Sequence, residues 1–410
     1  MCVESGWEAL ADDDELRVRP RSIAAMLCTV GLHLAVLGAL APVLPLYVLS
    51  LRATTAQWGA IAASNGLVMI FSEPVWGWAA DRFGFRRPYA LSRLASALEF
   101  WLLVLWPGLW AVVVFQALSG LFDTTIGVLS RGYLVRAYGP GRQTYGLSLY
   151  LIVYSICLAI GSTVGGYLYE HMGARAVFVA IAALATMGAV VSSVLEEPKM
   201  GLPPPLPEHG KAPHVGARGL LAGPLLILGS AGLIQFVANR VVRNFLVLLA
   251  QDHAGLDATA VGLLFGAFSL ANVVFLMAMN RFDQRVSLTT RIVLGLAMGA
   301  VGLAAYSLAH SFAGFLVAVT FDALGWALAA PARVVMVGRF SPPGIYGAAL
   351  GLHGAWENVG VLLGPVLAGV LWERGGPTVA YQATAVLVAV GAVVALQLRH
   401  GQRAAVAERG

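Results

Sequence analysis

Long apolar runs, separated by short charged or Pro/Gly-rich segments, constrain this 410-residue chain more than any other feature. A helix that spans a bilayer needs roughly 20 apolar residues, and we find twelve runs of about that length. They are too long for the strands of a membrane barrel and lack strict alternation of polar and apolar residues. The predicted spans are residues 22–49, 57–76, 88–107, 109–130, 143–169, 174–195, 219–250, 258–279, 290–309, 312–338, 344–372 and 377–398.

The composition argues against a soluble protein. Only 11% of the residues are charged and the mean hydropathy is +0.78, whereas a soluble domain carries about 25% charged residues. So few charges cannot cover a water-facing surface, and we expect lipid to contact most of the exterior. The predicted fold class is therefore an all-α integral membrane protein.

The positions of Lys and Arg predict the orientation. With the N-terminus in the cytoplasm, 21 of the 26 basic residues fall on the cytoplasmic side, a count that includes Arg93 and Arg333. Such a bias is what the positive-inside rule describes, so the net charge of +5 is assigned to topology and not to nucleic acid. No cleavable signal pattern is visible. We expect a multi-pass protein of the inner or plasma membrane with both termini in the cytoplasm.

The chain also shows signs of an internal duplication. Residues 196–218 contain six prolines and mixed charges, which indicates a solvated linker between two bundles. Weak sequence echoes at an offset near 203 relate Gly161–Gly166 to Gly364–Gly369. Duplicated bundles allow two halves to rock about a central site. The predicted organisation is a cytoplasmic tail at 1–21, an N-terminal six-helix bundle at 22–195, a cytoplasmic linker at 196–218, a C-terminal six-helix bundle at 219–398, and a cytoplasmic tail at 399–410.

A charged motif joins the second and third predicted spans. It reads Gly77-Trp-Ala-Ala-Asp-Arg-Phe-Gly-Phe-Arg-Arg, ending at Arg87. The glycine in its centre permits a tight turn, and we expect its aspartate to face guanidinium groups or a helix N-terminus. Such a contact would break when two halves move apart; a topological stop signal is the alternative. The candidates for this conformational latch are Gly77, Asp81, Arg82, Gly84, Arg86 and Arg87.

This motif resembles the G-x-x-x-D-R-x-G-R-R signature of the major facilitator superfamily, with Phe85 where that family usually has a basic residue. The twelve spans, the 6+6 division and the long middle loop extend the resemblance to the whole chain. It implies two pseudo-symmetric bundles that work by alternating access. The fifth span also resembles the G-P-x-x-G-G run of proton-driven exporters, with Ser162 in place of proline, whereas Gln116 replaces the arginine of the family's fourth-span pattern.

Small residues in the fifth and eleventh spans are candidates for close helix packing, because they let two backbones approach. An antiporter signature is the other interpretation of the same residues. The set comprises Gly161, Gly165, Gly166, Gly360, Gly364 and Pro365.

Polar residues inside the spans are the candidates for function, because a charged side chain at mid-bilayer costs about 2.5–3.5 kcal/mol. The candidates for proton coupling, with internal structural hydrogen bonds as the alternative, are Asp123, Asp322, His353 and Glu357. The candidates for a substrate cavity are His33, Gln116, Gln235, Asn239, Arg240 and Arg243. The two arginines indicate either an anionic group on the substrate or ion pairs with Asp322 or Glu357. Glu73 and Glu99 receive no role.

We predict a secondary active transporter of a small organic solute, with proton-coupled export of a lipophilic or amphipathic compound as the leading function. Uptake or exchange of a polar or anionic metabolite is the alternative, and a solute sensor on a transporter scaffold has less support. No Walker A sequence occurs, so we expect a gradient rather than ATP to drive transport. We expect no enzyme activity, no cofactor and no metal. The expected partners are a small-molecule substrate, protons and the bilayer, with no nucleic acid and a functional monomer.

Overall fold

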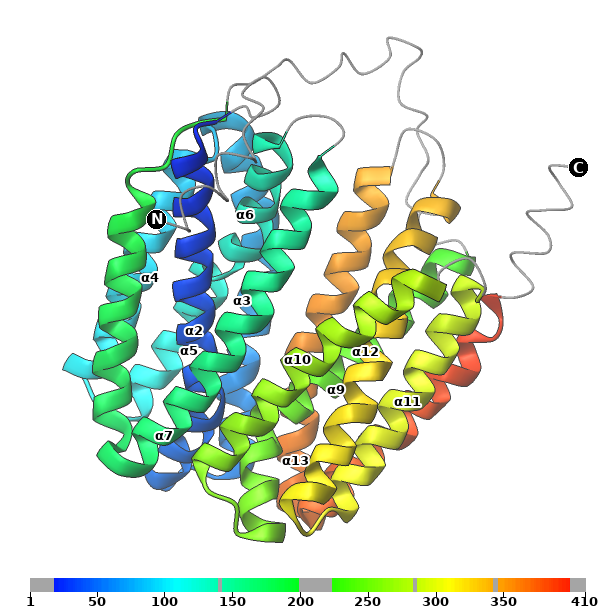
Figure 1. Cartoon of the computed structure of the whole chain (residues 1–410). Coiled ribbons are helices and arrows are strands. Elements are labelled where there is room, and N and C mark those ends of the chain that lie inside the picture. Colours follow the sequence, from blue (N-terminus) through cyan, green and yellow to red (C-terminus); the bar gives the residue numbers. More distant parts are fainter. Residues whose placement is uncertain (1–17, 139–141, 199–222, 283–285, 342–345, 399–410) are drawn as a thin grey trace, which may run out of the picture.

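The computed structural model describes residues 18–138, 142–198, 223–282, 286–341 and 346–398, and all of its regular elements within them are helices (Figure 1). The predicted all-α fold is confirmed. The helices are α2 (Pro20–Ser50), α3 (Thr55–Phe83), α4 (Arg86–Leu105), α5 (Leu109–Phe122), α6 (Thr124–Ala137), α7 (Gln143–Ser192), α9 (Gly223–Ala254), α10 (Ala258–Phe282), α11 (Leu288–Leu308), α12 (Phe312–Phe340) and α13 (Tyr346–Ala395).

The two longest helices each contain a sharp turn at one glycine. Helices α7 and α13 are 50 residues long, and Gly173 (φ +78°) and Gly376 (φ +82°) interrupt them. Glycine adopts this conformation without the steric cost that a Cβ would bring. Each helix therefore supplies two segments joined at that glycine (Figure 1).

Nine helices in the described part of the chain are long and apolar enough to cross a membrane, with α5 and α6 taken together and α3 left out. Divided at Gly173 and Gly376, the described helices follow the twelve predicted ranges in order. The largest differences within the N-terminal part are at α6, which continues to Ala137 instead of ending near residue 130, and at α3, which continues to Phe83 instead of ending near residue 76. Ala79 and Ala80 in the extension of α3 are buried, so packing prolongs that helix beyond its apolar run.

Local sequence signals set several helix starts. Thr54 and Gln57 form a capping box in which each side chain accepts a hydrogen bond from the other's backbone N–H, at 3.2 and 2.9 Å. Ser287 and Ser311 are the N-caps of α11 and α12, and each side chain accepts a hydrogen bond from the backbone N–H three residues later. Pro20 occupies the first turn of α2, where its missing N–H costs nothing.

The two halves of the chain repeat at the offset that the sequence echoes predict. Helices α7 and α13 begin 203 residues apart, as do α2 and α9, and Gly173 and Gly376 are separated by the same number. This regularity supports an internal duplication. The domain boundaries at 196–218 stay a prediction, because most of that segment lies outside the described residues.

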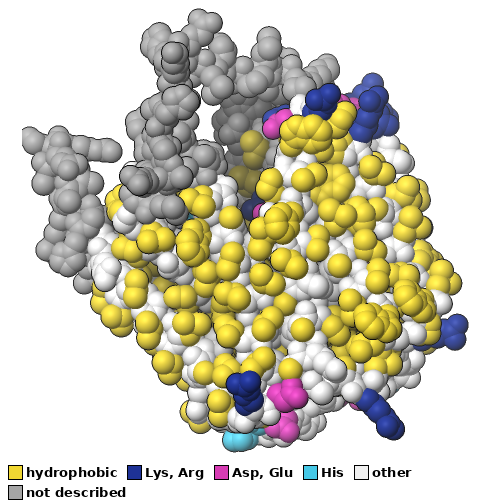
Figure 2. All heavy atoms as spheres, turned by 180° about the vertical axis from the view of Figure 1, so that it is seen from behind, with side chains coloured by type: hydrophobic (Ala, Val, Ile, Leu, Met, Phe, Trp, Pro, Cys, Tyr) yellow, Lys and Arg dark blue, Asp and Glu magenta, His cyan; other side chains and the backbone are white. Residues whose placement is uncertain are grey.

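The exterior is apolar around the middle and charged at the two ends (Figure 2). Leu91, Leu94 and Leu98 form an exposed stripe on α4 at helical spacing. Val386, Val390 and Val393 form a similar stripe on α13. A soluble protein rarely exposes contiguous apolar surface of this kind, so these faces meet lipid.

The two halves meet along a seam of close backbone contacts at one end of the molecule, here called the closed end. A Cβ at Gly59 on α3 would collide with the carbonyl of Pro365 on α13, and one at Gly166 on α7 with the carbonyl of Ala258 on α10. Farther along the same helices, Gly66 lies against Leu362, and Ser162 donates a hydrogen bond of 2.9 Å to the carbonyl of Gly262. The halves diverge toward the other end, the open end (Figure 1).

Replacing Gly59 with alanine is expected to weaken the seam, because the added Cβ meets backbone atoms of Pro365 that cannot rotate away. Overpacking costs about 1–3 kcal/mol, so states that are open at the closed end should gain roughly tenfold in population. The measurement is the rate at which an impermeant maleimide, applied to that end, modifies Asn65→Cys in protein that lacks other cysteines. Gly77→Ala on the same helix is the control, since a Cβ there meets nothing within 4 Å. Equal rates in the two variants would contradict the seam.

Candidate functional site

A cavity of about 630 Å³ lies between the two halves, next to the seam on the side of the open end. Helices α2, α3, α5, α6 and α7 supply its walls from one half, and α9, α12 and α13 from the other. Much of the wall is apolar, with Leu34, Phe115 and Phe236 among the lining residues. Its volume is within the range of about 300–1,000 Å³ that accommodates drug-sized ligands.

Trp58 closes the cavity at the seam. Its indole Nε1 donates a hydrogen bond of 3.0 Å to the backbone carbonyl of Asn244, and its side chain is almost fully buried. At the opposite limit the lining reaches Arg131 and Val334, which are within two turns of the open ends of α6 and α12. The cavity therefore extends from the seam toward the open end.

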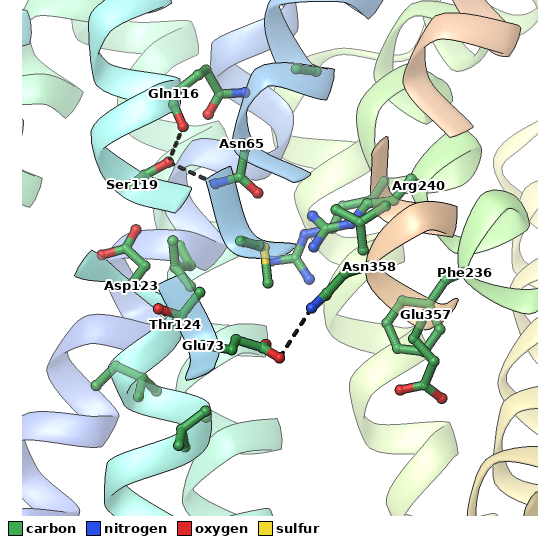
Figure 3. A pocket seen from close by; sticks show the side chains of 18 of the residues that line it. Asn65, Glu73, Gln116, Ser119, Asp123, Thr124, Phe236, Arg240, Glu357 and Asn358 are labelled. Carbon is green, nitrogen blue, oxygen red and sulfur yellow. Dashed lines mark hydrogen bonds between the residues drawn. The ribbon is translucent and has the colours of Figure 1, made fainter. Parts of the chain in front are cut away.

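A hydrogen bond between two side chains also joins the halves across the cavity. Asn358 on α13 donates to the Glu73 carboxylate on α3 at 3.0 Å (Figure 3). On the N-terminal wall, Asn65 donates to the hydroxyl of Ser119 at 2.9 Å, close to Gln116. Polar and charged side chains are therefore distributed along the wall, from Asn244 at the seam to Arg131 near the open end, and alternate with apolar positions.

Behind the N-terminal wall, an arginine is buried inside the bundle. Arg93 on α4 approaches His33 Nδ1 at 2.8 Å and donates to the Phe122 carbonyl at 2.6 Å and the Thr125 hydroxyl at 2.7 Å. The Phe122 carbonyl is available because α5 ends there and α6 begins at Thr124. A bundle interior holds a guanidinium only when it is surrounded by such acceptors.

Two carboxylates share this cluster. The Ser96 hydroxyl lies 2.9 Å from Asp123 Oδ1 and 3.3 Å from Glu99 Oε1, and His33 Nε2 lies 3.4 Å from Asp123. Glu99 is fully buried, whereas 11% of the Asp123 side chain is exposed and lines the cavity. Asp123 therefore connects a buried group of charges with the cavity.

The C-terminal wall holds a separate ion pair. Arg333 on α12 donates to the Glu357 carboxylate at 3.0 Å, and His353 lies 3.3 Å from the same carboxylate. The Arg333 side chain is 1% exposed. This ion pair balances the charge of one carboxylate with that of one guanidinium inside a single half.

Asp322 lies elsewhere in the C-terminal half. Its carboxyl is close to the hydroxyls of Tyr306 on α11 and Tyr381 on α13. It is not among the residues that line the described cavity. The structure therefore separates it from Asp123, His353 and Glu357, which all face the cavity.

Arg240 and Arg243 on α9 both line the cavity. Of the two interpretations left open by the sequence, ion pairs with Asp322 or Glu357 are not formed, because Glu357 pairs with Arg333 and Asp322 is outside the cavity. Within the described ranges, neither guanidinium has a carboxylate partner.

Three residues predicted for the cavity do not line it. His33 is buried against Arg93, and Gln235 and Asn239 precede Phe236 and Arg240 by one residue on α9. One residue turns a helix by about 100°, which is enough to remove a side chain from the wall. Gln116 does line the cavity.

The motif between α3 and α4 lies at the open end. Asp81 is 76% exposed and 3.6 Å from Arg136, and Arg82 stacks on Trp78 and Phe83. Gly77 has open space beside it and Arg87 is exposed.

The carboxylate at a helix N-terminus is that of Glu197, not Asp81. Glu197 accepts hydrogen bonds from the N–H groups of Phe85 and Arg86 at 2.7 and 2.9 Å, packed against Gly84 (φ +81°). Arg86 also donates to the carbonyl of Ser193. The position favours a negative charge because the first N–H groups of α4 point at it. The latch role of this motif stays a prediction.

The first residues of the predicted linker are attached to the N-terminal half. Glu196 accepts from Arg21 at 2.8 Å, and its N–H donates to Ser22 at 2.8 Å. The hydrogen bond from Arg21 lowers the pKa of Glu196 below its usual range. The bounds of the linker, 196–218, stay a prediction.

The small residues predicted for packing lie at helix contacts. Gly161 and Gly165 face Ala35 and Ala39 on α2, so α7 runs close to α2. Gly166 faces α10, Gly360 and Gly364 face Leu233 and Val237 on α9, and the Pro365 carbonyl faces Gly59. The glycines of α7 and α13 therefore hold both the interior of each half and the seam.

Sequence reasoning missed four groups: Glu73, Glu99, Arg93 and Arg333. The last two were counted as cytoplasmic, but both are buried within helices because each finds acceptors there. The available signal was that each of these arginines lies five residues inside its predicted span, 88–107 or 312–338. Among the described residues, no group of His, Cys, Asp or Glu is arranged to hold a metal ion.

Comparisons with known proteins settle the family. The profile of the Major Facilitator Superfamily matches residues 26–238 and 228–410. The chain belongs to this superfamily. It is a membrane transporter and not an enzyme, and it sits in the bilayer as a multi-pass protein.

Relatives of this member of the superfamily include drug-resistance proteins. The class G tetracycline resistance protein of Vibrio anguillarum is 24% identical over 385 residues, which cover 90% of this chain and 92% of that protein. Multidrug export protein EmrB of Haemophilus influenzae is 25% identical over 122 residues, which cover 30% of this chain and only 24% of EmrB.

Solved structures share the fold at low identity. The nucleoside transporter NupG has a TM-score of 0.73 at 14% identity and covers 92% of this chain and 98% of its own. A bacterial homologue of the human lysosomal transporter Spinster, described as inward-facing and unoccupied, has a TM-score of 0.74 at 16% identity, covering 92% and 97%. Both likenesses show the fold alone.

Replacing Arg93 with glutamine is expected to destabilise the protein, because Asp123 and Glu99 then lack the buried guanidinium. Breaking a buried charge arrangement by removing one partner costs about 3–5 kcal/mol, so the unfolding midpoint in detergent should fall by several degrees. Adding Glu99→Gln should restore part of the loss, since it removes one carboxylate. Arg243→Gln is the matched control without a described carboxylate partner. An unchanged midpoint in Arg93→Gln would contradict this description of the cluster.

Proposed function

We propose that this transporter exports an amphipathic organic compound in exchange for protons, with its N-terminus in the cytoplasm. The observation that carries the proposal is the position of Asp123, which faces the cavity and belongs to a buried cluster. That cluster has two carboxylates, Asp123 and Glu99, for one guanidinium, Arg93. A proton on one carboxyl balances the charge, and a buried group strongly favours such balance.

The proton site is assigned to this cluster and not to the other candidates. Glu357 is already balanced by Arg333 within the C-terminal half. Asp322 is separated from the cavity wall. Only a carboxyl that meets the cavity can exchange a proton with the same space that holds the substrate, and Asp123 meets this condition with an excess of negative charge behind it.

The substrate class follows from the wall and the relatives. The cavity is large, and its wall combines apolar side chains with polar and charged ones. This combination suits a drug-sized amphipathic compound. One relative of similar length is named for resistance to tetracycline, and others are named for multidrug export. These names support export as the direction.

Orientation and assembly complete the proposal. The open end carries Arg82, Arg86, Arg87 and Arg136, and an excess of basic residues marks the cytoplasmic side. The open end then faces the cytoplasm, where an exporter loads its cargo. One chain supplies every described wall of the cavity, so a monomer is the proposed working unit.

The test is flux of amphipathic drugs, tetracycline first, in liposomes that contain the purified protein and an imposed pH gradient. Asp123→Asn should abolish the response to the gradient, because an amide cannot exchange a proton. Asp322→Asn is the matched control, a second carboxyl within a helix, and should retain the response. The proton-exchange mechanism would be contradicted if flux did not change with the pH gradient, or if the two variants responded equally to it. Failure of every drug to move would sink export.

A further inference from the structure

Arg240 and Arg243 lie near the middle of α9, close to the point where Trp58 closes the cavity at the seam. They are three residues apart and therefore share one face of the helix, and both line the cavity. The backbone carbonyl of Asn244, the next residue, accepts the hydrogen bond from Trp58 that closes the cavity. Figure 3 shows Arg240 reaching toward the space between Asn65 and Asn358.

The guanidinium groups of this pair are unsatisfied within the described part of the chain. Neither makes an ion pair or a side-chain hydrogen bond there, and Arg240 Nε is buried without an acceptor. The carboxylates that share the cavity have other partners: Glu357 has Arg333, and Glu73 has Asn358. Asp123 belongs to the Ser96 cluster.

The arrangement is costly without a ligand. Two positive charges repel each other at this spacing, and a charge near the middle of a membrane-spanning helix is expensive unless it is paired. The backbone also fixes the position of the pair, since a Cβ at Gly364 on α13 would collide with the Cβ of Arg240. Two guanidinium groups that repel each other and are fixed in position beside the seam indicate a binding site for a negatively charged group.

We propose that Arg240 and Arg243 bind the carboxylate, or a similar acidic group with two equivalent oxygens, of an amphipathic substrate. This inference rests on the proposed function and narrows its substrate class to organic acids. A guanidinium donates two parallel N–H groups that match a carboxylate. The apolar body of the substrate lies against Phe236 on the C-terminal side and Leu37 and Phe115 on the N-terminal side, all of which line the same cavity.

Three probes with one body and different head groups test the proposal: 1-pyrenebutyrate (anion), 1-pyrenebutanol (neutral) and a pyrenebutyl trimethylammonium (cation). Binding to the purified full chain is measured by fluorescence in detergent. We expect the anion to bind roughly 10- to 100-fold more tightly than the alcohol, as for hydrogen bonds to charged groups. The double variant Arg240→Gln/Arg243→Gln should lose this preference while it keeps the weaker binding of the alcohol.

Two further variants keep the result interpretable. Arg175→Gln, an exposed arginine outside the cavity, should behave as the unmodified protein does. Arg240→Lys/Arg243→Lys retains the charge without the planar fork and should fall between the others, which also covers a glutamine variant that does not fold. Equal binding of the three probes, their complete lack of binding, or a preference for the anion that survives in the double glutamine variant overturns the inference.

The failure of this inference is distinct from that of the proposed function. Proton-driven flux of the alcohol or the cation, with no effect of the arginine substitutions, would overturn the anion site and leave proton exchange intact. Arginine-dependent binding of pyrenebutyrate without any response of its flux to a pH gradient would leave the anion site intact and overturn proton exchange.

Discussion

The close approach of backbones at glycines is the contact on which the rest of this structure depends. Where α3 meets α13 and α7 meets α10, positions such as Gly59 and Gly166 leave no room for even one methyl group. Contacts of this kind hold the halves together without long side chains, so little has to be rearranged when they separate. In the part of the chain that the structure describes, the glycine contacts between the halves lie toward the closed end, and this asymmetry places the cavity on the open side of the seam.

Three groups of charged residues within the helices carry the functional account once the seam has placed the cavity. Arg333 and Glu357 balance each other inside the C-terminal half. The cluster around Arg93 has an excess of carboxylate, and Arg240 and Arg243 have an excess of positive charge. A balanced pair contributes to the architecture of one half, whereas an excess of either sign requires a proton or a ligand. The proposed exchange of protons for an organic acid follows from the two unbalanced groups.

Much of the fold was predictable because lipid imposes simple rules. Apolar length predicts the spans, and the glycine echoes predict the offset of 203 that Gly173 and Gly376 reproduce. The site was predictable only in part. Asp123, Arg240 and Gln116 do line the cavity, because polar residues within spans rarely face lipid. The sequence does not reveal which helix supplies a partner, so Arg93 and Arg333 were counted on the cytoplasmic side. Asn239 was assigned to the cavity wall together with Arg240, but only Arg240 lines the described cavity.

The central claim is that the halves pivot about the cavity so that its two ends open in turn. Distances between spin labels test it most directly, with one pair at the closed end (Arg52→Cys and Glu373→Cys) and one at the open end (Phe83→Cys and Arg339→Cys). In liposomes with substrate and an imposed pH gradient, we expect the closed-end distance to lengthen as the open-end distance shortens. Distances that stay fixed, or that change in the same direction, would contradict alternating access.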